Sequence, residues 1–156
     1  MSIVLASGLA VSRVLAMPSE QVIVASCRSA QSLLSQLEKT DAVQRINRGR
    51  LYSNTLNLLF AMNARLNSNH IIAPNLTGLT SNFATGLSNF RDDYGRYDDD
   101  LNRATSIDCV ATPTEFYSRL ETARVSRARV ANDVANLNQL MDSYQAELDA
   151  AVKGAP

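Results

Sequence analysis

The first residues that could do chemistry are five aspartates in the second half of the chain, Asp92, Asp93, Asp98, Asp99 and Asp100. Clustered carboxylates can bind a divalent cation, because such ions prefer oxygen ligands. Their spacing does not match an EF-hand loop, where alternating oxygen ligands are followed by a glycine and a distant glutamate. We therefore expect a solvated acidic face that pairs with basic neighbours. A cation-binding protein that uses this acidic run remains an alternative.

The chain carries no other group of residues typical of an enzyme. His70 is its single histidine, and no cysteine or carboxylate cluster stands near it at the spacing of a metal site. No nucleophile elbow, phosphate-binding loop or dinucleotide-binding glycine motif occurs. Fifteen basic side chains balance fifteen acidic ones, so the charge excess of a nucleic-acid binder is missing. We predict a protein that is not an enzyme, with no catalytic, cofactor or metal residues and no nucleic-acid partner.

Two cysteines, Cys27 and Cys109, form the second candidate site. They lie at the start of the first expected helix and in the turn before the third, and these places share one end of an up-down-up bundle. A disulfide would close a loop of about eighty residues and stabilise the fold by ~4.5 kcal/mol in the chain-entropy model. If the second helix is extended to Cys109, that residue lies level with Leu33, and Cys27 is about 9 Å further along the axis of the bundle. The disulfide therefore requires that the residues after Leu101 leave the helix and bring Cys109 closer to Cys27. We predict the disulfide; the alternative is two separate buried thiols.

Helices must position these residues. Apolar side chains recur every three or four positions along most of the chain, as in helices that pack side by side. They predict an all-α fold, an elongated antiparallel up-down-up three-helix bundle or coiled coil. The helices are expected at about 27–67, 75–104 and 113–152, in one domain spanning 27–152. Hydrophobic residues make up 46% of the chain, with only 6 glycines and 4 prolines, which suits long helices. Such stripes also permit a homo-oligomer.

Local signals predict where the helices begin and where the first is weak. Asn75 is the expected N-cap of the second helix, because its side chain can accept a bond from an unpaired amide. The segment Thr112–Glu115 (Thr-Pro-Thr-Glu) predicts a third helix that begins with proline inside a capping box. Gly49 predicts a bend, and a break near Thr40-Asp41 is an alternative. The apolar stripe of the first helix should include Leu33, Leu34, Leu37, Val43, Ile46, Tyr52, Leu56, Leu59, Met62 and Leu66.

A belt of opposite charges is expected between the second and third helices. Folding one back on the other sets Asp100 level with Arg119, and Asp93 level with Arg127. Such pairs would help to fix the register, as flanking charges do in coiled coils. Arg127 interrupts the apolar stripe of its helix, so it is the candidate buried charge, either paired with Asp93 or extending its guanidinium to water.

The N-terminal residues read as an export signal. An apolar block runs from Ile3 to Val11, and small residues precede a cleavage site after Ala16, so residues 1–16 are expected to be a signal peptide. No basic residue precedes the block, which departs from the usual pattern, and an ordinary frayed chain end is the alternative. Residues 17–26 are expected to be a linker. No segment is long and apolar enough to span a membrane.

A recognisable layout is set by the positions of Cys27, Tyr52, Leu56, Leu59, Leu66, Tyr94, Tyr97, Leu101, Cys109 and Phe116. With these residues in place, the chain resembles small, uncharacterised, predicted secreted coiled-coil proteins of candidate-phylum bacteria with reduced genomes. The resemblance covers most of the chain after Val22 and implies export and three helices; it brings no known catalytic residue or ligand.

The predicted function follows from shape and from the missing catalytic set. A helical rod is expected to have no deep cleft, whereas enzyme active sites are usually concave. We therefore expect a secreted or envelope-associated helical protein that acts as a structural or partner-binding module, with a protein or envelope component as its partner. A cytosolic coiled-coil adaptor or chaperone-like protein with reduced thiols is the alternative.

Overall fold

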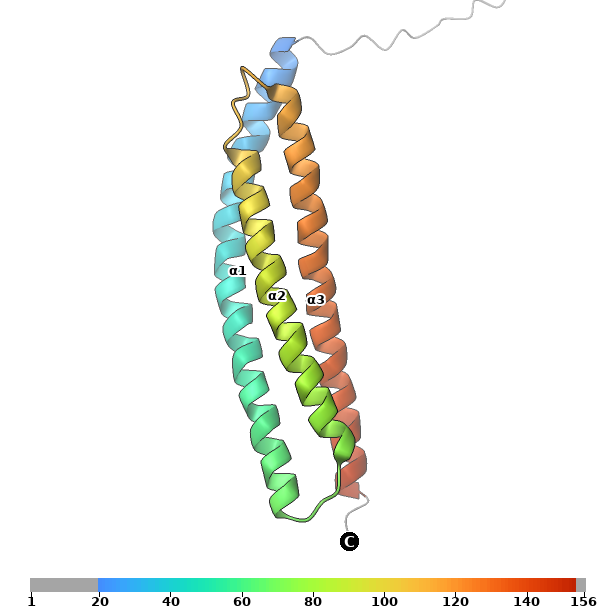
Figure 1. Cartoon of the computed structure of the whole chain (residues 1–156). Coiled ribbons are helices and arrows are strands. Elements are labelled where there is room, and N and C mark those ends of the chain that lie inside the picture. Colours follow the sequence, from blue (N-terminus) through green and yellow to red (C-terminus); the bar gives the residue numbers. More distant parts are fainter. Residues whose placement is uncertain (1–19, 154–156) are drawn as a thin grey trace, which may run out of the picture.

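Three long helices make up the structure. The computed structural model describes residues 20–153, and all regular structure in that span is helical. The helices are α1 (Glu20–Ser68), α2 (Pro74–Thr105) and α3 (Pro113–Lys153). They lie side by side as a slender rod with a turn at either end (Figure 1). The prediction of an all-α up-down-up three-helix bundle is confirmed.

The central helix is α2. It packs closely along α3 and along much of α1, whereas α1 and α3 contact each other at few places. Burial follows this arrangement, because α2 buries ten residues, α3 six and α1 only four. The bundle is therefore two helix pairs that share α2, with an open side between α1 and α3. The buried residues of α2 are Leu76, Thr80, Phe83, Gly86, Leu87, Phe90, Tyr94, Tyr97, Leu101 and Ala104.

Helices α2 and α3 pack closely at a glycine, Gly86. A Cβ atom on Gly86 would lie 3.1 Å from Cδ2 of Leu137 and 3.4 Å from Nδ2 of Asn136. Leu137 is 0% exposed, so its side chain fills the space that the missing Cβ leaves. Glycine lowers the intrinsic stability of α2 at this position, but its missing side chain allows the two helices to pack tightly.

Helix α1 differs from its predicted course. It begins at Glu20, so the predicted linker 17–26 is wrong over residues 20–26, and the helix runs unbroken past Thr40 and Gly49. Glu20 places a carboxylate in the first turn, where the helix dipole favours negative charge. Gly49 meets no atom within 4 Å, so its only cost is propensity, about 1 kcal/mol, which a 49-residue helix tolerates. The predicted signal peptide, residues 1–16, lies outside the described residues.

The apolar stripe of α1 is narrower than predicted. Leu33, Val43 and Ile46 are exposed, at 66%, 55% and 55%. Tyr52 and Leu59 are buried as expected. The reason is that α1 packs mainly on one neighbour, α2, which covers only a strip of its surface.

The helix ends follow the prolines rather than the predicted side-chain caps. Helix α2 starts at Pro74 without a side-chain cap, and Asn75 instead donates from Nδ2 to Oε2 of Glu147 at 3.3 Å. The predicted Asn75 N-cap is therefore wrong, because the helix begins at Pro74 and Ala73 occupies the N-cap position. Helix α3 starts at Pro113 as predicted. The hydroxyl of Thr112 donates to the carbonyl of Asp108 at 3.4 Å, which differs from the capping-box role.

Candidate functional site

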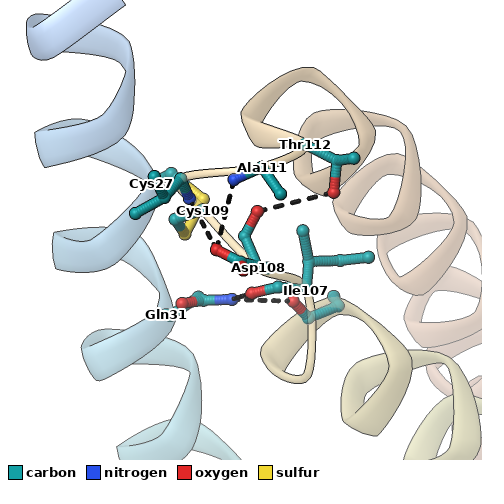
Figure 2. Close-up of a disulfide and its surroundings, with 9 residues drawn as sticks. Cys27, Gln31, Ile107, Asp108, Cys109, Ala111 and Thr112 are labelled. Atoms are coloured by element: carbon teal, nitrogen blue, oxygen red, sulfur yellow. Dashed lines mark hydrogen bonds between the residues drawn. A yellow bond between two sulfur atoms is a disulfide. The ribbon is translucent and has the colours of Figure 1, made fainter.

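The two cysteines meet at one end of the rod. Cys27 and Cys109 form a disulfide, with their Cα atoms 5.7 Å apart (Figure 2). The cysteines are 0% and 4% exposed and pack with Phe116 of α3, which is 0% exposed. One small apolar cluster therefore ties the start of α1, the second turn and the start of α3 together.

The second turn brings Cys109 closer to Cys27 than an extension of α2 as a helix would. Helix α2 stops at Thr105, and the chain then crosses toward α1, where Nε2 of Gln31 donates to the carbonyl of Ile107 at 2.7 Å. Oδ1 of Asp108 accepts hydrogen bonds from the backbone N–H groups of Val110, at 2.8 Å, and Ala111, at 3.2 Å (Figure 2). These two bonds hold the pKa of Asp108 below its usual value. The tightened turn brings the second cysteine against α1.

A polar cross-link joins all three helices at mid-height. Asp41 of α1 accepts the hydroxyl of Tyr97 at Oδ2 (2.7 Å) and the hydroxyl of Tyr94 at its carbonyl (2.5 Å). Nε of Arg127, on α3, lies 3.6 Å from the same Oδ2. Burial first, and then Asp41, raise the pKa of both tyrosines, so they remain protonated donors at neutral pH.

A second polar cross-link lies nearer the opposite end. Asn63 of α1 donates from Nδ2 to Oγ1 of Thr80 on α2 at 2.9 Å and accepts the hydroxyl of Tyr144 on α3 at 2.7 Å. Thr80 and Tyr144 are 1% and 4% exposed. The sequence analysis missed both cross-links. The available signal was a polar residue, Asp41 or Asn63, on the inward face of α1.

The predicted charge pairs do not form. Arg127 lies by Asp41 instead of Asp93, and its side chain is 56% exposed, so its guanidinium reaches water rather than the core. Asp93 pairs with Arg96 at 3.1 Å within its own helix. Arg119 pairs with Glu115, also at 3.1 Å and also within one helix.

The register between α2 and α3 explains this difference. Asp100 accepts the hydroxyl of Ser126 at 2.5 Å instead of facing Arg119. Ser126 lies seven residues further along α3, about 10 Å. Simple fold-back arithmetic centres the pivot near residue 109, whereas the contact of Asp100 with Ser126 centres it near residue 113.

The acidic run is distributed among separate neighbours. Asp98 pairs with Arg45 of α1 at 3.1 Å, while Asp93 and Asp100 have the partners given above. Within residues 20–153 no group of three or more His, Cys, Asp or Glu side chains is placed to hold a metal ion. His70 lies in the first turn with a φ of 59°, where it ends α1.

A groove opens on the side between α1 and α3. It has a volume of about 550 Å³ and lies at the level of Asp41, with α2 as its floor. This differs from the expectation of a rod without a cleft, and the reason is the sparse contact between α1 and α3. The floor is aromatic, made by Phe90, Tyr94 and Tyr97, and the rims carry Arg48, Arg124 and Arg127.

Comparisons with protein-family models, curated proteins and solved structures give no match for this chain. The described helices include none with a stretch long and apolar enough to cross a membrane. The fold and its contacts define a disulfide-clamped three-helix bundle with an open groove, and any functional argument starts from that geometry.

Proposed function

We propose that this chain is an exported, non-enzymatic helical protein that acts as a structural or partner-binding module at the cell envelope. The observation that carries the proposal is the buried disulfide between Cys27 and Cys109. Structural disulfides persist in oxidising compartments and are rare in the cytosol, where thiols are kept reduced. The predicted signal peptide, residues 1–16, supports the same location.

The exposed side of α1 supports the partner-binding part of the proposal. Leu33, Leu51 and Leu58 are 66%, 60% and 70% exposed. They are 18 and 7 residues apart, close to whole numbers of helical turns, so all three lie along one line of α1. A row of exposed leucines has a hydration cost that a partner surface can remove.

Intact mass measured on protein from its natural compartment tests export and the disulfide together. The sample is unfolded in denaturant and then alkylated, once without reductant and once after reduction. We expect no alkylation without reductant, two alkyl groups after reduction, and a mass that lacks residues 1–16. Two alkylated cysteines in unreduced, unfolded protein from the cytosolic fraction would overturn the proposal in favour of a cytosolic adaptor or chaperone-like protein.

Site-specific photocrosslinking tests the binding face. A crosslinking residue at Leu58 is compared with one at Asn57, which is also exposed but points to another side of α1. We expect a discrete crosslinked product in the envelope fraction from position Leu58 only. Equal products from both positions, or none from either, would argue against a partner on the leucine row.

A further inference from the structure

The groove between α1 and α3 occupies one stretch of the open side of the rod. The cluster of Cys27, Cys109 and Phe116 and the hydrogen bond from Tyr144 to Asn63 lie beyond its two ends, each about 20 Å along α1 from the lining. The lining spans Asp41–Arg48 on α1, about 10 Å, and Arg124–Val134 on α3, about 15 Å. A volume of about 550 Å³ lies within the range of small-ligand pockets.

The floor of the groove is held in place without a ligand. Phe90 and Tyr94 pack edge to face with ring centroids 5.6 Å apart, and Tyr94 and Tyr97 do so at 5.8 Å. Both tyrosine hydroxyls are fixed by Asp41. Because these rings are already ordered, an apolar group that binds above them causes little loss of conformational freedom in the protein side chains.

The rims are positively charged. Three arginines line the groove against one acidic residue, Asp41, whose carboxylate already accepts the hydroxyl of Tyr97 and faces Arg127. Arg48 takes part in none of the ion pairs found within residues 20–153. Arg124 lies 3.5 Å from Glu121, but both side chains are about two-thirds exposed, so water weakens that pair. Arg127 faces Asp41 through its Nε at 3.6 Å, but its side chain is 56% exposed, so its terminal nitrogens, like those of Arg48, remain available to a carboxylate.

We propose that this groove binds a small amphiphile, an apolar chain or ring about 10–15 Å long with a single carboxylate. Its apolar body lies against Ala128, Ala131 and Val134, above the nearly buried aromatic floor, and its carboxylate binds Arg48 and Arg127. The length of the lining, about 10–15 Å, matches such a molecule. The inference goes beyond the proposed function and does not depend on export, because it rests on the groove alone.

Calorimetric titration of the full-length oxidised protein with monomeric decanoate tests the proposal. Decyltrimethylammonium and decanol serve as cationic and neutral probes of the same chain length. We expect saturable binding of one decanoate per chain, with an affinity at least about tenfold higher than for either control probe. Equal affinity for all three probes, or no decanoate binding, would overturn the proposal.

Variants locate the site. Arg48→Gln and Arg127→Gln should each weaken decanoate binding about tenfold, because each removes one charge-assisted contact. Arg129→Gln is the matched control, since it removes the same charge from α3 outside the groove lining. Ala131→Phe, at an exposed position in the lining, should abolish binding without disturbing the core. Equal losses in the Arg129 and Arg127 variants, with all four folded by circular dichroism, would refute the assignment.

A vesicle arm separates this ligand from a lipid surface. Vesicles of phosphatidylglycerol and phosphatidylcholine are tested for co-sedimentation with the wild-type protein and with the Ala131→Phe variant. We expect decanoate binding in solution and no dependence of co-sedimentation on Ala131→Phe. Binding only to anionic vesicles would replace the groove with a general electrostatic contact and overturn the proposal.

Discussion

Removing the Cys27–Cys109 disulfide should lower the free energy of unfolding by about 4.5 kcal/mol. The bond joins residues 82 positions apart, and a loop of that length restricts the unfolded chain by roughly this amount in the chain-entropy model. A chain of this size changes its melting temperature by roughly 3 °C per kcal/mol. The reduced protein should therefore melt about 13 °C below the oxidised protein.

Thermal melting followed by circular dichroism measures this effect. Oxidised wild type is compared with wild type in a phosphine reductant and with a Cys27→Ala/Cys109→Ala variant. Alanine is chosen because both positions are buried, where a serine hydroxyl would be left unpaired. The reductant should not change the melting of the variant, which makes the variant its own control.

A drop of less than about 4 °C in both the reduced protein and the variant would refute this reasoning. It would mean that the unfolded chain keeps enough structure near the turns that the bond no longer restricts it. Amide hydrogen exchange adds a second readout. Loss of the bond should speed exchange most in Glu20–Ala30, because the disulfide cluster contains the first buried contacts of α1.

Four further predictions follow from the cross-links and the helix interiors. Asn63→Ala should cost about 1–3 kcal/mol in urea unfolding, because it removes the hydrogen bonds to the buried hydroxyls of Tyr144 and Thr80 and leaves Tyr144 only the long contact, 3.4 Å, with the carbonyl of Leu59. Gly49→Ala should add about 0.5–1 kcal/mol, because its Cβ would meet no atom within 4 Å. Burial first, and then the carboxylate of Asp93, raise the pKa of Asp133. The ionised carboxyl therefore destabilises the native state at pH 7, and Asp133→Asn should stabilise the protein there. Millimolar calcium should leave the melting temperature unchanged, because no three of the described His, Cys, Asp and Glu side chains are placed to hold a metal ion together.

Controls make two of these measurements sharper. Gly86→Ala should gain less than Gly49→Ala, since its Cβ would lie 3.1 Å from Leu137. The Asp133→Asn advantage should shrink as the pH falls toward about 4, because a raised native pKa favours the native state only when the carboxyl is protonated. An advantage that grows on acidification would contradict the burial of that carboxyl.

Local sequence signals predicted the outline of the fold well. Periodicity marked three helices, and Pro113 marked the start of the third because proline lacks the N–H that a first helical residue does not need. Cys27 and Cys109 could be placed at one end from helix lengths alone, since antiparallel neighbours with short turns return to the same level.

Cross-helix partners were beyond the sequence for a physical reason. Which residues meet depends on the register and rotation of each helix, and these are set by packing far away in the chain. The turn before Pro113 displaced the register enough that Asp100 meets Ser126. Val43 follows the helical period but is exposed, because periodicity cannot reveal that α1 has one close neighbour rather than two. Asp41 is a single acidic residue on the inward face of α1, and nothing in its local sequence indicates that Tyr94, Tyr97 and Arg127 converge on it.

The position of the disulfide also decides what a protease can release. Ile72, in the turn between α1 and α2, is 89% exposed and is an accessible place for a cut. The two resulting fragments each hold one cysteine, so they stay covalently attached and a gel without reductant shows a single band. A cut after Cys109, by contrast, frees α3 from every covalent tie. A cut in the turn between α1 and α2 therefore leaves the chain covalently joined, whereas a cut after Cys109 leaves α3 held only by its packing.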